Sequence, residues 1–236
     1  MSERILEIKD LRGGYKPGVD ILNGIDLAIQ PGEILGVIGL NGSGKSTLGK
    51  ALVNLLPFQS GTVKFRGEDI SHIGTDKLVK RGLKMMMQGG RVFGNLSVWQ
   101  NLELSAQKEL PYVIEQYKEK IPLLDKPAKE LKSITADKLS GGQRLQLALA
   151  MTIAGNPSCI ILDEPSAGLA PNSVDKMYEL LHDIHQASGV TIILIEQNIA
   201  KAITFADRCI LLNQGKITRE FSSGDIKEVE KEMFNL

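Results

Sequence analysis

The sequence predicts an α/β fold with a mainly parallel sheet, an antiparallel portion at its start and a helical insertion near its middle. Continuous apolar runs, typical of strands covered on both faces, alternate with segments of helical spacing. One such run leads directly into a glycine-rich loop, and strand signals disappear between residues 89 and 138. With 236 residues, 42% of them hydrophobic and 24% charged, the chain is long enough for one large domain that carries an insertion.

The antiparallel portion is predicted from the first third of the chain. Residues 5–11 and 21–29 alternate apolar and polar side chains, which indicates two half-buried strands. The second strand ends at a turn formed by Pro31 and Gly32. Residues 62–70 then predict a short hairpin.

The parallel core is predicted from apolar runs that alternate with amphipathic segments. Buried strands are expected at residues 34–38, 83–87, 159–162, 191–195 and 209–212. Helical spacing indicates helices at residues 46–56, 142–155 and 172–187, and a surface helix in the charged tail, residues 225–236.

The stretch from residue 89 to residue 138 differs from both. It is rich in Leu, Gln, Glu and Lys and is interrupted by three prolines, which indicates a mostly helical insertion. We therefore expect a single domain over residues 1–236, with a core of residues 1–88 and 139–236 and a helical subdomain of residues 89–138.

Charge and cysteine content exclude several classes of function. Lys plus Arg equals Asp plus Glu at 28 each, so the basic excess typical of nucleic-acid binding is absent from the sequence. Cys159 and Cys209 lie far apart inside apolar runs, which argues against a disulfide framework or a zinc site. No stretch approaches the roughly 18 apolar residues of a membrane span, so we expect a chain that does not cross a bilayer by itself.

The glycine-rich loop fits the pattern G-x-x-x-x-G-K-[ST] and lies between a predicted buried strand and a predicted helix, as a phosphate-binding loop should. Its glycines let backbone N–H groups turn inward to cradle phosphates. Lys45 supplies a charge for the β- and γ-phosphates, and the Ser46 hydroxyl suits Mg²⁺. The expected binding residues of this loop are Gly39, Leu40, Asn41, Gly42, Ser43, Gly44, Lys45, Ser46 and Thr47.

Two acids follow the apolar run at residues 159–162. Parallel sheets bind ligands at the carboxyl ends of their strands, so Asp163 and Glu164 are expected beside the glycine loop. There Asp163 can hold Mg²⁺ through water, while Glu164 can polarise an attacking water as a general base. A strand that ends in acids can also be only a solvated strand end, and it is the combination with the loop that favours the functional reading.

A third motif, Leu139 followed by Ser140, Gly141, Gly142 and Gln143, opens a predicted helix. Ser140 is a natural helix cap, and the two glycines bare the backbone at the helix start, which suits an anion. This LSGGQ resembles the signature motif of the ATP-binding cassette (ABC) family. The order of loop, insertion, LSGGQ and acidic strand is also similar to the order found in that family.

The resemblance implies a P-loop NTPase fold of the ABC type that hydrolyses ATP with Mg²⁺. Such domains dimerise head to tail, so that each ATP lies between one chain's glycine loop and its partner's signature. In the family pattern Gln88 corresponds to a glutamine that contacts Mg²⁺ and water, and Tyr15 to an aromatic that stacks on adenine. Residues 166–169 correspond to a loop that reaches across the dimer. The expected metal ligands are therefore Ser46, Gln88 and Asp163.

The chain departs from the family pattern at Gln197. The family normally places a histidine after the strand that corresponds to residues 191–195, where it contacts the γ-phosphate, whereas this sequence reads Glu196, Gln197 and Asn198. A glutamine can donate a hydrogen bond, but unlike a histidine it cannot take up a proton or carry a charge. We list Glu164, Gln197 and Lys45 as catalytic candidates, and we expect the site to hydrolyse slowly while its signature completes a partner's site.

Several segments narrow the subfamily. Residues 90–102, 164–171, 196–198 and 206–208 are similar to the shorter ATP-binding subunit of branched-chain amino-acid importers and of its urea-importer relatives. That resemblance implies a second ATP-binding subunit in a heterodimer, two membrane permease subunits, an external or periplasmic solute-binding protein, and a place at the cytoplasmic face of the membrane; a homodimer stays open. Phe93, Leu96 and Val98 are our candidates for the surface that docks a permease.

Three alternatives remain at this stage. A soluble ABC ATPase that acts on nucleic acid or ribosomes usually carries two cassettes or a long coiled-coil insertion. Gln197 is compatible with a binding module that has negligible turnover, whereas the intact Glu164 argues against one. An export ATPase, for example for lipid carriers, resembles this chain closely, although such subunits tend to retain the histidine.

Overall fold

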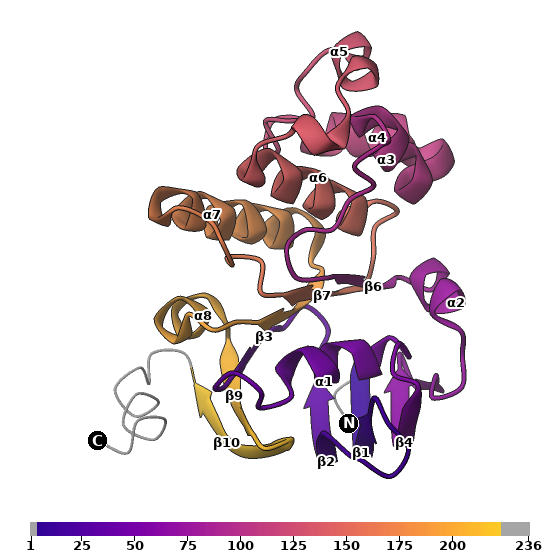
Figure 1. The fold of residues 1–236 in the computed structure, drawn as a ribbon, viewed down its shortest axis with the longest axis vertical. Helices are drawn as coiled ribbons and strands as arrows, with labels where there is room; N and C mark the ends of the chain where they lie inside the picture. Colours follow the sequence, from indigo (N-terminus) through magenta and orange to yellow (C-terminus); the bar gives the residue numbers. More distant parts are fainter. Residues whose placement is uncertain (1–3, 223–236) are drawn as a thin grey trace.

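A computed structural model describes residues 4–222, and its larger sheet confirms the predicted parallel core (Figure 1). The strand order is β10-β9-β3-β8-β7-β6, and every neighbouring pair is parallel except β9 with β10. The strands are β3 (Ile34–Ile38), β6 (Leu83–Met86), β7 (Cys159–Asp163), β8 (Thr191–Ile195), β9 (Arg208–Asn213) and β10 (Lys216–Ser222). Every residue of β3, β7 and β8 is buried, as their continuous apolar sequences predict.

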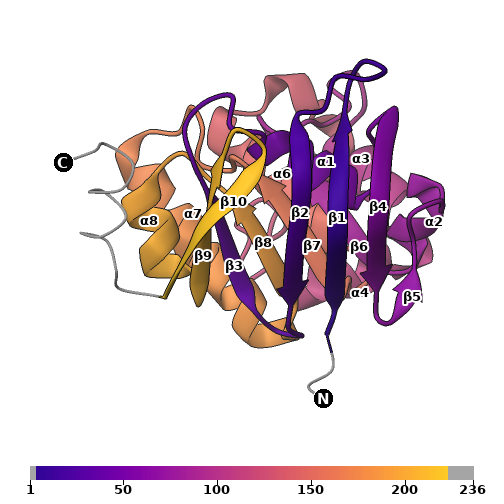
Figure 2. The same cartoon turned by 90° about the horizontal axis from the view of Figure 1, so that it is seen from below.

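A second, antiparallel sheet has the order β2-β1-β4-β5 and lies across the first (Figure 2). Its strands are β1 (Leu6–Gly14), β2 (Leu22–Ile29), β4 (Phe58–Phe65) and β5 (Glu68–Asp69). In its register Leu6 pairs with Ile29 on one side and with Phe65 on the other. The antiparallel N-terminal portion is therefore confirmed, with the predicted hairpin joined to it through β4.

Helix α1 (Lys45–Leu52) fills the space between the two sheets. Its side chains Leu48 and Leu52 are buried in one apolar cluster with residues of both sheets, including Leu11 of β1 and Ile161 of β7. The helix is shorter than the predicted residues 46–56, because Asn54 takes a left-handed backbone conformation, with φ of 54°, and its amide donates to the carbonyls of Ile70 and Ile73.

The opposite face of the larger sheet is covered by longer helices (Figure 1). Helix α6 begins at a capping box in which the Ser140 hydroxyl accepts from the Gln143 N–H, and helix α7 ends at Gly189 in the left-handed conformation that glycine favours. Residues 89–138 contribute three further α-helices, and the division of the chain at residues 88 and 139 stays a prediction. These helices are α6 (Gly141–Ile153), α7 (Pro171–Ser188), α3 (Val98–Ala106), α4 (Leu110–Tyr117) and α5 (Ala128–Ser133). Two short α-helices, α2 (Thr75–Lys80) and α8 (Ile199–Phe205), and two 3-10 helices, η1 (Gln107–Glu109) and η2 (Ala136–Lys138), complete the helices of residues 4–222.

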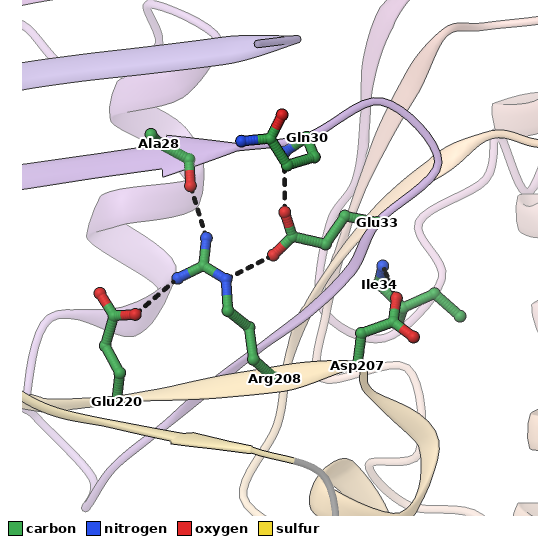
Figure 3. A network of polar contacts seen from close by, with 7 residues as sticks. All are labelled: Ala28, Gln30, Glu33, Ile34, Asp207, Arg208 and Glu220. Atoms are coloured by element: carbon green, nitrogen blue, oxygen red, sulfur yellow. Dashed lines mark hydrogen bonds and ion pairs between the residues drawn. The ribbon is translucent and has the colours of Figure 1, made fainter. Parts of the chain in front are cut away.

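An ionic cluster joins the amino end of the larger sheet to the turn between β2 and β3 (Figure 3). The Arg208 guanidinium donates to Glu33 at 2.6 Å, to Glu220 at 2.9 Å and to the carbonyl of Ala28. Beside it the Asp207 carboxylate accepts from the N–H of Ile34 at 2.8 Å. We call Glu33, Asp207, Arg208 and Glu220 the Arg208 cluster.

Some expectations need correction or lie outside what the structure describes. Val98 is wrong as a docking candidate because its side chain is fully buried in the core, whereas Phe93 is 57% exposed. The predicted tail helix falls outside the described residues 4–222. Strand β10 was not predicted. No helix within residues 4–222 is both long enough and apolar enough to cross a membrane.

Candidate functional site

The glycine loop, residues 39–47, follows β3 and leads into α1. At Gly39 a side chain would collide with the Leu212 carbonyl, which lies 2.3 Å from an ideal Cβ position, so the close approach of β9 requires glycine there. Gly42 and Gly44 have φ of 81° and 106°, which glycine adopts without strain. The Gly215 N–H donates to the Ser43 carbonyl at 2.9 Å and fixes the loop to the β9–β10 turn.

Lys45 is buried at the centre of this loop, with 5% of its surface exposed. Its Nζ donates to the carbonyls of Gly39 at 2.9 Å and Leu40 at 3.1 Å. Burial lowers its pKa, and the charges of Glu164, Asp163 and Glu196 act in the opposite direction. The buried Ser43 hydroxyl beside it has no hydrogen-bond partner among the described residues. A buried cation and an unpartnered hydroxyl in a loop of glycines fit an anionic group such as a phosphate.

Ser46 and Asp163 meet at the carboxyl end of β7. The Ser46 hydroxyl donates to Asp163 Oδ1 at 2.8 Å, and Asp163 is only 2% exposed. Burial raises the pKa of Asp163; the bond from Ser46 lowers it and the neighbouring charge of Glu164 raises it. This pair of oxygen ligands fits Mg²⁺, which proteins usually hold through one or two side chains together with substrate phosphates. Gln88, the third expected ligand, directs its amide to Glu164 instead.

Glu164 directly follows β7, which lies between β6 and β8 in the sheet, and it receives one hydrogen bond from the segment after each of these two neighbours. It follows β7, while Gln88 lies two residues beyond β6 and Gln197 two residues beyond β8. Gln197 Nε2 donates to Glu164 Oε1 at 2.6 Å, and Gln88 Nε2 donates to Oε2. Glu164 is 7% exposed and has a φ of 48°, an unusual backbone conformation of the kind that collects at functional sites. The structure thus brings three sequence-predicted residues together.

Tyr15 contacts α1, the helix that the glycine loop leads into. It is 45% exposed, and its hydroxyl accepts from Lys50 Nζ at 3.1 Å on the exposed side of α1. A half-exposed aromatic ring near the glycine loop is suited to stacking on a flat ligand.

The signature residues Ser140, Gly141, Gly142 and Gln143 do not join the cluster. They begin α6, which packs on α3 and β6, whereas α1 packs on β7 and β8 from the other side of the sheet (Figure 1). The side chains of Ser140 and Gln143 bond to each other's backbone. Any ligand that these signature residues bind from this position would therefore lie outside the Lys45 site.

One residue of the site received no role from the sequence. Glu196 is 1% exposed and accepts from the N–H and hydroxyl of Ser166 at 3.1 and 2.9 Å. The available signal was an acid directly after the apolar run at residues 191–195, which is the same pattern that identified Asp163 and Glu164.

With this geometry, the comparison with known families has a clear result. The family model described as "ABC transporter" matches residues 22–167, more than half of the chain. The chain belongs to the ABC transporter family. Its fold is that of an ABC ATPase domain, so the expected fold class and ATPase activity are confirmed.

Individual relatives refine the placement. The chain is 32% identical, over 96% of both proteins, to a probable branched-chain amino acid transport ATP-binding protein, LivF, of Archaeoglobus fulgidus. It is 28% identical, over 95% of this chain and 93% of the relative, to the lipopolysaccharide export ATP-binding protein LptB of Escherichia coli. Among solved structures, CbiO1 of Clostridium perfringens, part of the ABC transporter complex CbiONQ, matches 98% of this chain and 92% of its own with 28% identity and a TM-score of 0.80.

Proposed function

We propose that this chain is the ATP-hydrolysing subunit of an importer for branched-chain amino acids or a related small polar solute. The observation that carries the proposal is the similarity to the archaeal branched-chain amino acid protein along nearly the whole of both chains. Gln197, in place of the usual histidine, supports the same subfamily.

Within this proposal, residues 39–47 hold the phosphates of ATP, with Lys45 on the β- and γ-phosphates and Tyr15 stacked on adenine. Ser46 and Asp163, with Gln88, hold Mg²⁺, which when bound would neutralise charge on the phosphate oxygens. Glu164 acts as the general base for the attacking water. Gln197, bonded to Glu164 Oε1, fixes the direction of that carboxylate.

The proposed partners follow from the exposed signature. Ser140 and Gly141 lie on the surface, where they are accessible to a second ATP-binding subunit. We infer a heterodimer in which they complete the partner's site, at the cytoplasmic face of a membrane that holds two permease subunits. A solute-binding protein would act through those permeases.

ATP binding is tested first by titrating Mg²⁺-ATP into the purified chain and into Lys45→Ala. We expect binding by the native chain and loss of most of it in the variant. Absence of binding by the native chain would contradict the proposal at its root. Hydrolysis measured alone, with the partner subunit, and in Gln197→His then tests whether Gln197 limits turnover: a large gain in the variant would support slow intrinsic hydrolysis.

Transport is tested in proteoliposomes that contain this chain together with its second ATP-binding subunit, the two permease subunits and the solute-binding protein. ATP-driven uptake of leucine, or of urea, supports the proposal, and Phe93→Ala should reduce uptake by roughly tenfold while ATP binding is unchanged. If Phe93→Ala weakens ATP binding, its role as a docking residue is wrong.

A second candidate function rests on the similarity to the Escherichia coli export protein. In that case the chain would power the export of a lipid carrier. The same proteoliposomes distinguish the two, because an exporter would leave amino acids and urea untouched while its ATP hydrolysis responded to added glycolipid.

A further inference from the structure

Glu196 is a buried carboxylate in the site that the proposed mechanism does not use. Its oxygens accept three hydrogen bonds: from the Ser166 N–H at 3.1 Å, from the Ser166 hydroxyl at 2.9 Å and from the Gln197 N–H at 3.1 Å. Burial raises the pKa of the nearby Tyr178 phenol, and the charge of Glu196 raises it further.

These bonds close a ring around the general base. Ser166 follows Glu164 by two residues, and Gln197 follows Glu196 directly. The Gln197 side chain returns to Glu164 Oε1 at 2.6 Å. The ring therefore runs along the chain from Glu164 to Ser166, across to Glu196, along to Gln197 and back to Glu164. The ring thus links the loop that follows β7 to the loop that follows β8 twice, once through Glu196 and once through Glu164.

A carboxylate is a costly choice for this position if it serves packing alone. Each donor that Glu196 meets is neutral, whereas a buried charge is usually paired with an opposite charge. Lys45, whose charge interacts with that of Glu196, donates its own hydrogen bonds to backbone carbonyls. Only a carboxylate, however, accepts at both oxygens, because an amide would present a donor at one of them.

We propose that Glu196 is a positioning residue for ATP hydrolysis: it fastens the Gln197 loop to the Ser166 loop and thereby orients Glu164. It acts through Ser166 and Gln197 and does not itself touch the substrate. The proposal rests on the proposed role of Glu164 as general base, and it is independent of what the transporter carries.

The fastening is tested by amide hydrogen exchange in Glu196→Gln. At least one of the N–H groups of Ser166 and Gln197 should exchange at least about tenfold faster, because they bond to different oxygens of Glu196 and an amide keeps an acceptor at only one of the two positions. The Glu164 N–H, which donates to the Ile195 carbonyl at 2.9 Å, serves as the internal control and should not change. Unchanged exchange at Ser166 and Gln197 would overturn the proposal.

The consequence for hydrolysis is tested with Ser166→Ala, which removes one bond to Glu196 and leaves the fold intact, and with Ser166→Thr, which restores the hydroxyl. Measured with the subunits that support turnover, Ser166→Ala should lower kcat by about tenfold with KM unchanged, and Ser166→Thr should recover it. Ser133→Ala, which removes a hydroxyl bonded to the Glu130 carbonyl, is the matched control and should leave kcat unchanged.

The double variant Glu196→Gln with Ser166→Ala excludes an effect of Ser166 on a partner chain. If both residues act through their mutual bonds, the double variant should be no slower than the slower single variant. Strict additivity, or a change in KM alone, would overturn the proposal. Glu164→Gln is measured beside them: if it hydrolyses ATP at the native rate, the proposed role of Glu164 fails, whereas a fast Ser166→Ala beside an inactive Glu164→Gln refutes only the role of Glu196.

Discussion

The carboxylates at the two ends of the larger sheet differ in the partners that they contact. At the amino end, Arg208 lies between Glu33 and Glu220, and its guanidinium donates to both and to a backbone carbonyl. At the carboxyl end, Asp163, Glu164 and Glu196 are more deeply buried, at 2%, 7% and 1% exposed, and their donors are amides and hydroxyls. Lys45, whose charge interacts with all three, donates its hydrogen bonds to carbonyl oxygens.

The difference separates a cluster that stabilises the fold from one that is arranged for a ligand. In the Arg208 cluster Glu33 and Glu220 both pair with the Arg208 guanidinium, and the Asp207 carboxylate accepts from a backbone N–H, so partners within the chain satisfy the cluster. In the carboxyl-end cluster the excess negative charge and the unpartnered Ser43 hydroxyl fit Mg²⁺ and phosphate together. Substitutions at the amino end should therefore reduce stability, and those at the carboxyl end should reduce activity.

The largest expected effect is that of Glu164→Gln. The amide cannot accept a proton from the attacking water, so kcat should fall by about 10² to 10⁴-fold, the usual contribution of a general base. Binding of Mg²⁺-ATP should persist, because Lys45, Ser46 and Asp163 are unchanged. Steady-state hydrolysis and calorimetric titration of the same preparation check this, and a loss of binding would place Glu164 among the ligands of the nucleotide.

Next in size is Arg208→Ala. The change removes the partner of Glu33, whose side chain is 9% exposed, and should lower the free energy of unfolding by about 2 to 3 kcal/mol. Arg81→Ala is the matched control: Arg81 pairs with Glu68 where the two side chains are 42% and 70% exposed, and its loss should cost about 0.5 kcal/mol. Urea denaturation measures both, and equal midpoints would remove the distinction between these two ion pairs.

The smallest effect has the opposite sign. The pKa of Asp163 is raised by burial, so its contribution to stability is present below its ordinary pKa of 3.8 and is lost as the pH rises through the higher folded value. Asp163→Asn keeps the acceptor for Ser46 and removes the charge, so it should stabilise the protein at pH 7 by about 1 kcal/mol. Thermal unfolding in chelator without nucleotide should show the gain, and the two proteins should converge near pH 4.

A destabilised Asp163→Asn at pH 7 would contradict the view that this end of the sheet sacrifices stability for binding. With saturating Mg²⁺-ATP the order should reverse, since only the native chain gains the full linkage energy of the metal.

Sequence patterns predicted the strands that have a continuous apolar run or a clear alternation, and they failed where most side chains of a strand are exposed. The bounds of β3 and β8 agree with prediction because their apolar runs are continuous and end at polar residues. Strand β10 was missed because most of its side chains are exposed, so it carries no apolar signal. Its backbone is held by β9, a contact that only the folded chain supplies.

The same reason explains the site. Loop and strand-end motifs identified Lys45, Asp163 and Glu164, since their roles depend on neighbours in sequence. The bonds that join Gln88 and Gln197 to Glu164, and Ser166 to Glu196, connect residues 30 or more positions apart, and no local pattern encodes such contacts. Val98 was misjudged because its neighbours Phe93 and Leu96 are accessible while it faces the core.

The Glu164 carboxylate is held from two sides, by one hydrogen bond at each of its oxygens. One oxygen accepts from Gln88, at the point where β6 leads into the helices of residues 89–138, and the other accepts from Gln197, where β8 leads into α8. If either segment moves by itself, one bond breaks and the carboxylate can rotate about the other. The carboxylate is fixed in a single direction only when both segments are in place, so a movement of one segment alone would leave it free to rotate.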